Sequence, residues 1–181
     1  IWAGGYNTTD LNIIDYVSIA SLGNAVDYGD LTTNMNEVAG TASSTRGLIS
    51  GGFSNVINYI TIASTGNATH FGDLVVSNAG TRGGCGNQTR SVVAGGWTGS
   101  VNTNAIDYIN IATLGNAADF GDATLARAIN NGGIASSVRA VFSSGLVSES
   151  TANNTIDYVT IATTGNAIDF GDLDVATCSK G

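Results

Sequence analysis

The stretch IDYVTIATTGNAIDFGDL, residues 156–173, decides the fold, because near copies of it occur three more times in the 181 residues. The earlier copies begin at Ile14, Ile57 and Ile106, so the intervals are 43, 49 and 50 residues. A period of this length is typical of propeller blades or of helical arrays. Every copy carries Gly-Asn at its centre and Gly-Asp at its end, and these residues favour turns over helix interiors. The repeat therefore predicts propeller blades.

Each copy has the composition of a β-hairpin. Residues 155–161 are mostly β-branched or aromatic and place apolar groups on both faces, which is typical of a strand covered on both sides. Gly165-Asn166 tolerates positive φ and supplies the turn. The return strand always carries an aromatic residue: Tyr28, Phe71, Phe120 or Phe170. The predicted hairpins span residues 13–31, 56–74, 105–123 and 155–173.

Two further strands belong to each repeat. A short apolar run that ends in Gly-Gly and an aromatic residue, such as Val92–Trp97, precedes each hairpin. A weaker strand follows each Gly-Asp and leads to Arg46, Arg90 or Arg139. Four short antiparallel strands in each of four repeats predict an all-β fold, a β-propeller that forms a single domain over residues 1–181.

The repeat resembles a known family in these residues. The apolar-Gly-Gly-aromatic run, the Tyr-bearing strand, the Gly-Asn turn and the following aromatic strand resemble the kelch repeat, which forms propeller blades. The chain departs from kelch where that repeat has a second-hairpin Trp, and the kelch Arg after that hairpin appears only as Arg127. The pattern of residues 156–173 also resembles repeats in virion structural and tail-fibre proteins of aquatic phages. The resemblance implies a blade architecture and a virion or extracellular location.

The two ends of the chain read into one another. Ser179-Lys180-Gly181 followed by Ile1–Gly5 reproduces residues 45–52 in register, which predicts a closing blade shared between the two termini. Only 7 residues separate Leu173 from Lys180, against 15 between Leu31 and Arg46, so the closing blade is expected to be incomplete. Three alternatives follow: a trimmed blade, a segment of a longer array, or a strand donated by a neighbouring subunit. The start at Ile1 indicates a processed product or part of a longer polypeptide.

Composition excludes several partners and cofactors. The net charge of −8, from 14 acidic and 6 basic residues, argues against binding to nucleic-acid phosphates. No apolar run approaches the roughly 20 residues that cross a bilayer, so no membrane insertion is expected. A single histidine and two cysteines without metal-ligand spacing predict no cofactor.

The aspartates fall on repeated positions. Asp15, Asp107 and Asp157 lie within apolar strands, where an unpaired carboxylate is costly, so they are expected to pair with bases. The expected structural network joins them to one base per repeat: Arg46, Arg90, Arg139 and Lys180. Each Asp-aromatic-Gly-Asp corner offers only two carboxylates, which are few for Ca²⁺, so turn formation is favoured and no metal is expected. The weak calcium candidates are Asp27, Asp30, Asp119, Asp122, Asp169 and Asp172.

Function is expected to be non-catalytic. An enzyme needs an asymmetric set of groups, whereas these repeats offer the same residues four times, and one histidine cannot ligate the metal of the copper-radical oxidases built on kelch propellers. The leading hypothesis is a structural or adhesive module of a virion appendage or extracellular fibre, whose partners are copies of itself, other fibre proteins and cell-surface glycans. One alternative is a carbohydrate-binding propeller that presents Tyr6, Phe53 and Trp97 in the loops after Gly-Gly. Another is a filament subunit joined by strand donation at the incomplete blade.

Overall fold

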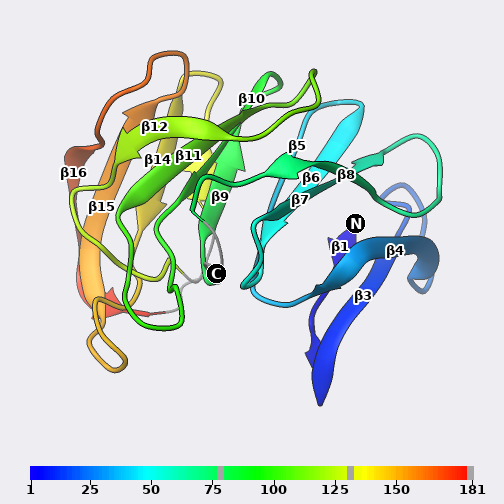
Figure 1. Cartoon of the computed structure of the whole chain (residues 1–181), viewed down its shortest axis with the longest axis horizontal. Helices are drawn as coiled ribbons and strands as arrows, with labels where there is room; N and C mark the ends of the chain where they lie inside the picture. The colour runs from blue at the N-terminus through cyan, green and yellow to red at the C-terminus, as the bar shows by residue number, and fades with distance from the viewer. Residues whose placement is uncertain (77–79, 130–132, 179–181) are drawn as a thin grey trace.

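The computed structural model describes residues 1–76, 80–129 and 133–178, and these form sixteen strands. The strands make four antiparallel four-stranded sheets, here called blades 1 to 4 in chain order. Figure 1 shows the blades side by side, with blade 1 in blue and blade 4 in yellow to red at opposite sides. The described residues include no helix, and so none that could cross a membrane. The predicted all-β fold with four antiparallel sheets is confirmed.

Blades 2, 3 and 4 are built alike. The four strands of each blade pair in chain order, so every neighbour in the sheet is also a neighbour in sequence. The first strand of each blade is the weak strand that follows the Gly-Asp of the preceding repeat. Each blade therefore begins one strand earlier than the sequence repeat. The bounds are β5 Val38–Ala42, β6 Arg46–Gly51, β7 Val56–Thr61, β8 Thr69–Asp73, β9 Gly83–Gly86, β10 Arg90–Ala94, β11 Ala105–Asn110, β12 Ala118–Asp122, β13 Gly133–Ala135, β14 Arg139–Ser143, β15 Asn153–Thr160 and β16 Ile168–Thr177.

Blade 1 differs, because its central strand β3 pairs with all three others. Within the described ranges, the outer edge of β1 has no strand beside it. The residues after Leu173 continue β16, which pairs with β15 as far as Asn153 opposite Thr177, and residues 179–181, which were expected to read into Ile1, lie outside the described residues. The described strands therefore leave the ring open, and the predicted shared closing blade is not formed by them. The bounds are β1 Trp2–Ala3, β2 Tyr6–Asn7, β3 Thr9–Tyr16 and β4 Val26–Met35.

Every hairpin contains a β-bulge at its aromatic residue. In blade 3, Ile106 lies opposite Gly121 and Asp107 lies opposite Asp119, so Phe120 is the extra residue. The same shift occurs in the other three blades. The bulged ring packs edge-on against the repeat tyrosine, with Tyr108 and Phe120 centroids 6.0 Å apart. The bulge explains why an aromatic residue and a glycine adjoin in every copy.

Each Gly-Asn-Ala turn binds the bulge of the preceding blade. Between blades 3 and 4, the Gly165 N–H donates to the Phe120 carbonyl at 2.7 Å, and the Ala167 N–H donates to the Asp122 carbonyl at 2.7 Å. The Asp122 N–H donates in return to Oδ1 of Asn166 at 3.1 Å. These three hydrogen bonds are called the interblade clip. It satisfies backbone groups that would otherwise be left at the ends of the hairpins.

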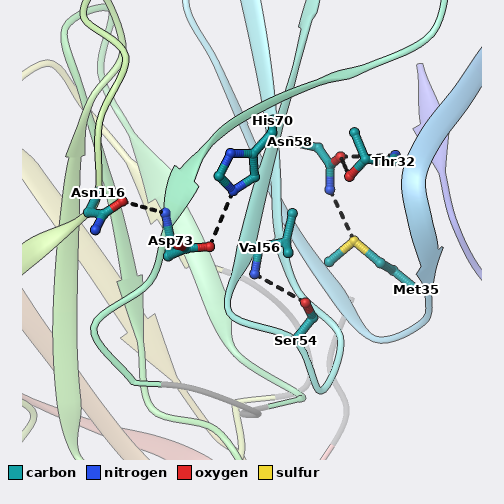
Figure 2. Close-up of polar contacts among 8 residues, drawn as sticks. All are labelled: Thr32, Met35, Ser54, Val56, Asn58, His70, Asp73 and Asn116. Carbon is teal, nitrogen blue, oxygen red and sulfur yellow. Dashed lines mark hydrogen bonds and ion pairs between the residues drawn. The ribbon is translucent and has the colours of Figure 1, made fainter.

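The interblade clip recurs at the two other junctions between consecutive blades. Figure 2 shows one of its bonds, in which the Asp73 N–H points at the amide oxygen of Asn116, 3.0 Å away. Its two partners are Gly115 N–H to the Phe71 carbonyl and Ala117 N–H to the Asp73 carbonyl. The repeated Gly-Asn and Gly-Asp motifs are therefore the two halves of one joint. The copy between blades 1 and 2 uses Tyr28, Asp30, Gly66, Asn67 and Ala68.

The repeat arginines add a fourth contact. The guanidinium of Arg90 lies over the ring of Tyr108 at 4.4 Å, and its Nη1 donates to the Ile161 carbonyl of blade 4 at 2.8 Å. Arg46 makes the equivalent bond from blade 2 to the Ile111 carbonyl of blade 3 at 2.7 Å. These arginines therefore join neighbouring blades while their charge rests on an aromatic face.

The hydrophobic core lies between the blades. Cys85 on β9 is buried there, in one cluster with Val92 and Phe142, and a side chain on Gly133 would clash with its sulfur. Desolvation raises the pKa of the Cys85 thiol to about 12, although a backbone hydrogen bond from Val141 lowers it in part. The core therefore holds this thiol in its neutral form.

We expect Cys85 to make stability fall at alkaline pH. The unfolded thiol loses its proton near pH 9 and the folded thiol near pH 12, so its contribution is complete below pH 9 and is lost as the pH rises through 12. The free energy of unfolding should fall by about 1.4 kcal/mol per pH unit in that window. Denaturant unfolding of the protein and of Cys85→Ala from pH 8 upward measures this. A difference between the two proteins that does not change with pH would contradict it.

Candidate functional site

The Gly-Gly corners set the direction of the chain at one end of each blade. Gly51 ends strand β6 and Gly52 follows it, with φ of 89° and 68°, and Gly95 and Gly96 follow β10 with φ of 63° and 121°. Glycine adopts these angles at little cost because it has no Cβ. The corners turn the chain away from the ladder and place the next aromatic residue, Phe53 or Trp97, beyond the strand end.

Phe53 and Trp97 line one cavity of about 540 Å³. Its walls come from blades 2, 3 and 4, since the segments before the first strand and after the second strand of these blades meet there. The polar groups beside the two rings include Glu37, Asn102 and Glu149. Such a cavity, with aromatic walls and a few polar groups, has the general character of a small-molecule site.

Backbone strain gathers around this cavity. Glu37, Phe53 and Thr81 all line it, and they have φ of 50°, 59° and 52°, in the left-handed region that side chains other than glycine rarely adopt. Each such residue costs about 1–3 kcal/mol, which the surrounding structure must offset. Strained residues of this kind cluster at functional sites. The strain therefore favours this cavity as the place where the molecule acts.

The chain contains two glutamates, and both line the cavity. Partial burial, and after it the negative charge of Asp10, raise the pKa of Glu37. Asn102 is held in place because its Nδ2 donates to the Leu146 carbonyl at 2.8 Å. The site thus combines two aromatic rings with carboxylate and amide groups that accept hydrogen bonds.

The three predicted ligand-binding aromatics do not act together. Phe53 and Trp97 share the cavity, whereas Tyr6 lies on β2 opposite Asp10, is 69% exposed and is not part of the lining. Sequence reasoning missed Glu37, Glu149 and Asn102. One signal was present, because the two glutamates lie outside the repeated acidic positions.

The calcium candidates serve the strands and junctions. Asp27, Asp119 and Asp169 lie opposite the strand aspartates, while the backbones of Asp30 and Asp122 belong to interblade clips. Asp172 occupies the same position in blade 4. Across the described ranges, no three or more His, Cys, Asp or Glu side chains form a group that could hold a metal ion.

Two of the strand aspartates form buried ion pairs, but with bases other than those predicted. Nη1 of Arg82 lies 2.7 Å from Oδ2 of Asp107, and Nη1 of Arg127 lies 2.8 Å from Oδ2 of Asp157, with all four side chains buried. Asp15 is only partly buried and has no ion pair among the described residues.

The expected network of Arg46, Arg90 and Arg139 with these aspartates is wrong. All three arginines lie over tyrosine rings instead, at 4.8, 4.4 and 4.5 Å. The reason is register, because these arginines begin the second strand of a blade, whereas each aspartate lies on the third strand, opposite the fourth residue of the second strand. The fourth expected base, Lys180, lies outside the described residues.

A neutral pair replaces the ion pair between blades 1 and 2. Asn58 stands at the repeat position of Asp157, and Met35 stands at that of Arg127. Figure 2 shows the Asn58 Nδ2 donating to the Met35 sulfur at 3.2 Å and the Thr32 hydroxyl donating to the Asn58 Oδ1 at 2.6 Å. The chain therefore changes both partners of this buried pair together.

This substitution pattern predicts the behaviour of variants at the junction between blades 3 and 4. Arg127→Met alone should lower the free energy of unfolding by about 3–5 kcal/mol, because it leaves the Asp157 carboxylate buried without its counter-ion. Adding Asp157→Asn should recover most of that loss by recreating the pair found at Met35 and Asn58. Denaturant unfolding of both single variants and the double variant measures the coupling, with Arg139→Met as a control at an exposed arginine. Additive losses in the double variant would contradict the pairing.

Asp107 lacks one contact that its equivalents have. The Thr32 and Thr124 hydroxyls donate to Asn58 and Asp157 from the third position after the glycine of Gly-Asp. That position is Val75 in the second repeat, and Oδ1 of Asp107 has no hydrogen-bond partner among the described residues.

We therefore expect Val75→Thr to stabilise the protein by about 1 kcal/mol, the typical value of one added hydrogen bond. A shift of the thermal or denaturant midpoint measures the gain. Val75→Ala is the control without a hydroxyl, and an equal change in both variants would disprove the added bond.

Comparison with known proteins assigns no family to the chain. No protein-family model matches it, and no curated protein matches it either.

Proposed function

We propose that this protein is a non-catalytic adhesive and structural module, a kelch-like propeller of a virion appendage or extracellular fibre, and that the cavity beside Phe53 and Trp97 binds a saccharide. The observation that carries the proposal is that residues shared by the repeats and residues that vary between them lie in different parts of the molecule. Residues that the four copies share make the interblade clips and the core, whereas the cavity is lined by positions at which the copies differ, such as Phe53, Trp97 and Leu146 at one repeat position. Binding specificity in repeat proteins resides in such variable positions.

The lining suits a sugar. Aromatic rings provide flat apolar faces for the C–H groups of a pyranose, and carboxylate and amide groups accept hydrogen bonds from its hydroxyls. Phe53 and Trp97 supply the rings, and Glu37, Asn102 and Glu149 supply the polar groups. The two glutamates disfavour an acidic sugar through charge repulsion, so the proposed ligand is a neutral or basic glycan.

The location rests on the repeat. The resemblance of residues 156–173 to repeats of phage virion and tail-fibre proteins supports a virion or extracellular setting. Cell-surface glycans, fibre proteins and copies of this chain are the proposed partners in that setting.

A glycan array and titration calorimetry test the binding. The protein should bind a defined class of glycans, and Trp97→Ala should weaken that binding about tenfold or more, equivalent to about 1.4 kcal/mol. Tyr6→Ala is the matched control, because Tyr6 is an exposed aromatic of the equivalent loop outside the cavity.

Two results would overturn the proposal. Absence of any glycan signal, or equal losses in Trp97→Ala and Tyr6→Ala, would remove the saccharide site, provided that both variants keep the unfolding midpoint of the parent. Release of reducing sugar from a bound glycan would show that the module is an enzyme. Glu37 and Glu149 would then be the first residues to replace.

Strand donation is a second candidate function, favoured by one observation. The open edge of β1 borders an apolar cavity of about 810 Å³, which β5 lines on its other side with Gly40, Thr41 and Ala42. In blades 2 to 4 the equivalent place holds the first strand of the blade. A strand from a neighbouring subunit would complete blade 1 and build a filament.

A further inference from the structure

We infer that two copies of this chain join head to tail through an intermolecular interblade clip, in which blade 4 of one copy meets blade 1 of the next. The inference goes beyond saccharide binding and does not depend on it. It rests on the two end blades of the chain, each of which presents one half of a joint that the molecule already makes three times internally.

Blade 4 presents the bulge half. Phe170, Gly171 and Asp172 have the residue types and the bulged register of the three bulges that are clipped. Phe170 is 56% exposed, whereas its equivalent Phe120 is 2% exposed because the turn of the next blade covers it. A Cβ built on Gly171 meets nothing within 4 Å, while one on Gly121 meets the backbone of Gly165 at 2.6 Å.

Blade 1 presents the turn half. Gly23, Asn24 and Ala25 repeat the Gly-Asn-Ala sequence and are exposed, and within the described ranges they form no interblade clip. Ile19 is fully exposed here, whereas its equivalent Ile111 is 1% exposed in an internal junction. Leu22 beside them is also fully exposed.

The hydrogen bond from a repeat arginine to the next blade also has its donor at one end of the chain and its acceptor at the other. Arg46 and Arg90 each donate to an isoleucine carbonyl of the following blade. Arg139 lies over Tyr158 in the same way, at 4.5 Å, and is exposed at the blade 4 end. The acceptor in equivalent position is the carbonyl of Ile19. Both halves thus hold every group that the internal junctions use.

A second copy is the occupant that these features fit. The bulge half and the turn half are different surfaces, so the contact is heterologous and cannot be made by two identical faces. Burial of Phe170 and Ile19 on joining removes apolar surface from water. Two copies that join at both ends would make a closed ring of eight blades, within the usual range for propellers, and a junction that does not close would make a fibre.

Sedimentation velocity and light scattering from about 1 to about 100 µM test the association. The protein should form species of at least twice the 18.2 kDa chain mass, and the fraction should rise with concentration. Ala25→Arg should abolish association without unfolding the chain, because Ala25 is exposed within one copy, whereas its equivalent Ala68 is buried in a junction. Ser100→Arg, at an exposed loop residue, is the control and should associate as the parent does.

A mixing experiment identifies the head-to-tail geometry. Ala25→Arg blocks only the turn half, and Phe170→Glu blocks only the bulge half, so each variant alone should be monomeric. Their mixture should form a 1:1 heterodimer that grows no further, because one intact half remains on each partner. Association of either variant alone would overturn the inference. A parent protein that stays monomeric at every concentration would also overturn it. The same holds if scattering shows a monomer in which blade 4 contacts blade 1 of the same chain.

Discussion

The interblade clip is the interaction on which the rest of this structure depends. Its backbone hydrogen bonds require two chain segments to approach more closely than side chains allow. A Cβ on Gly29, Gly72 or Gly121 would lie 2.5, 2.1 or 2.6 Å from the backbone of the next Gly-Asn turn. The aromatic bulge and the following glycine therefore have to occur together, and the turn that binds them has to carry an asparagine whose side chain accepts the returning N–H.

The buried polar pairs add specificity to the clips. Arg82 with Asp107 and Arg127 with Asp157 occupy two junctions, and Met35 with Asn58 occupies the third. A buried charge is costly unless its partner is present, so exchanging blades between junctions would leave charges unpaired. The clips hold neighbouring blades together in the same way at each junction, and these pairs distinguish one junction from another.

The surfaces proposed for function are those that take part in no interblade clip. The cavity takes its walls from three blades and its chemistry from positions that differ between the repeats, including Phe53, Trp97 and both glutamates. Phe170 and Asn24 remain exposed because, in the part of the chain that the structure describes, no turn covers the bulge of blade 4 and no bulge meets the turn of blade 1. In the internal junctions each turn covers a bulge. The surfaces proposed for ligand binding and for self-association are thus separate.

The sequence alone determined the all-β class, the four four-stranded sheets and the hairpins, because these follow from local turn residues and a short period of apolar positions. It also indicated that aspartates inside apolar strands need partners. Tertiary structure decided that Arg82 and Arg127, not Arg90 and Arg139, are those partners. It also decided that β16 extends along β15 and does not close the ring. Both outcomes depend on the register between segments distant in sequence, which a repeat pattern does not encode.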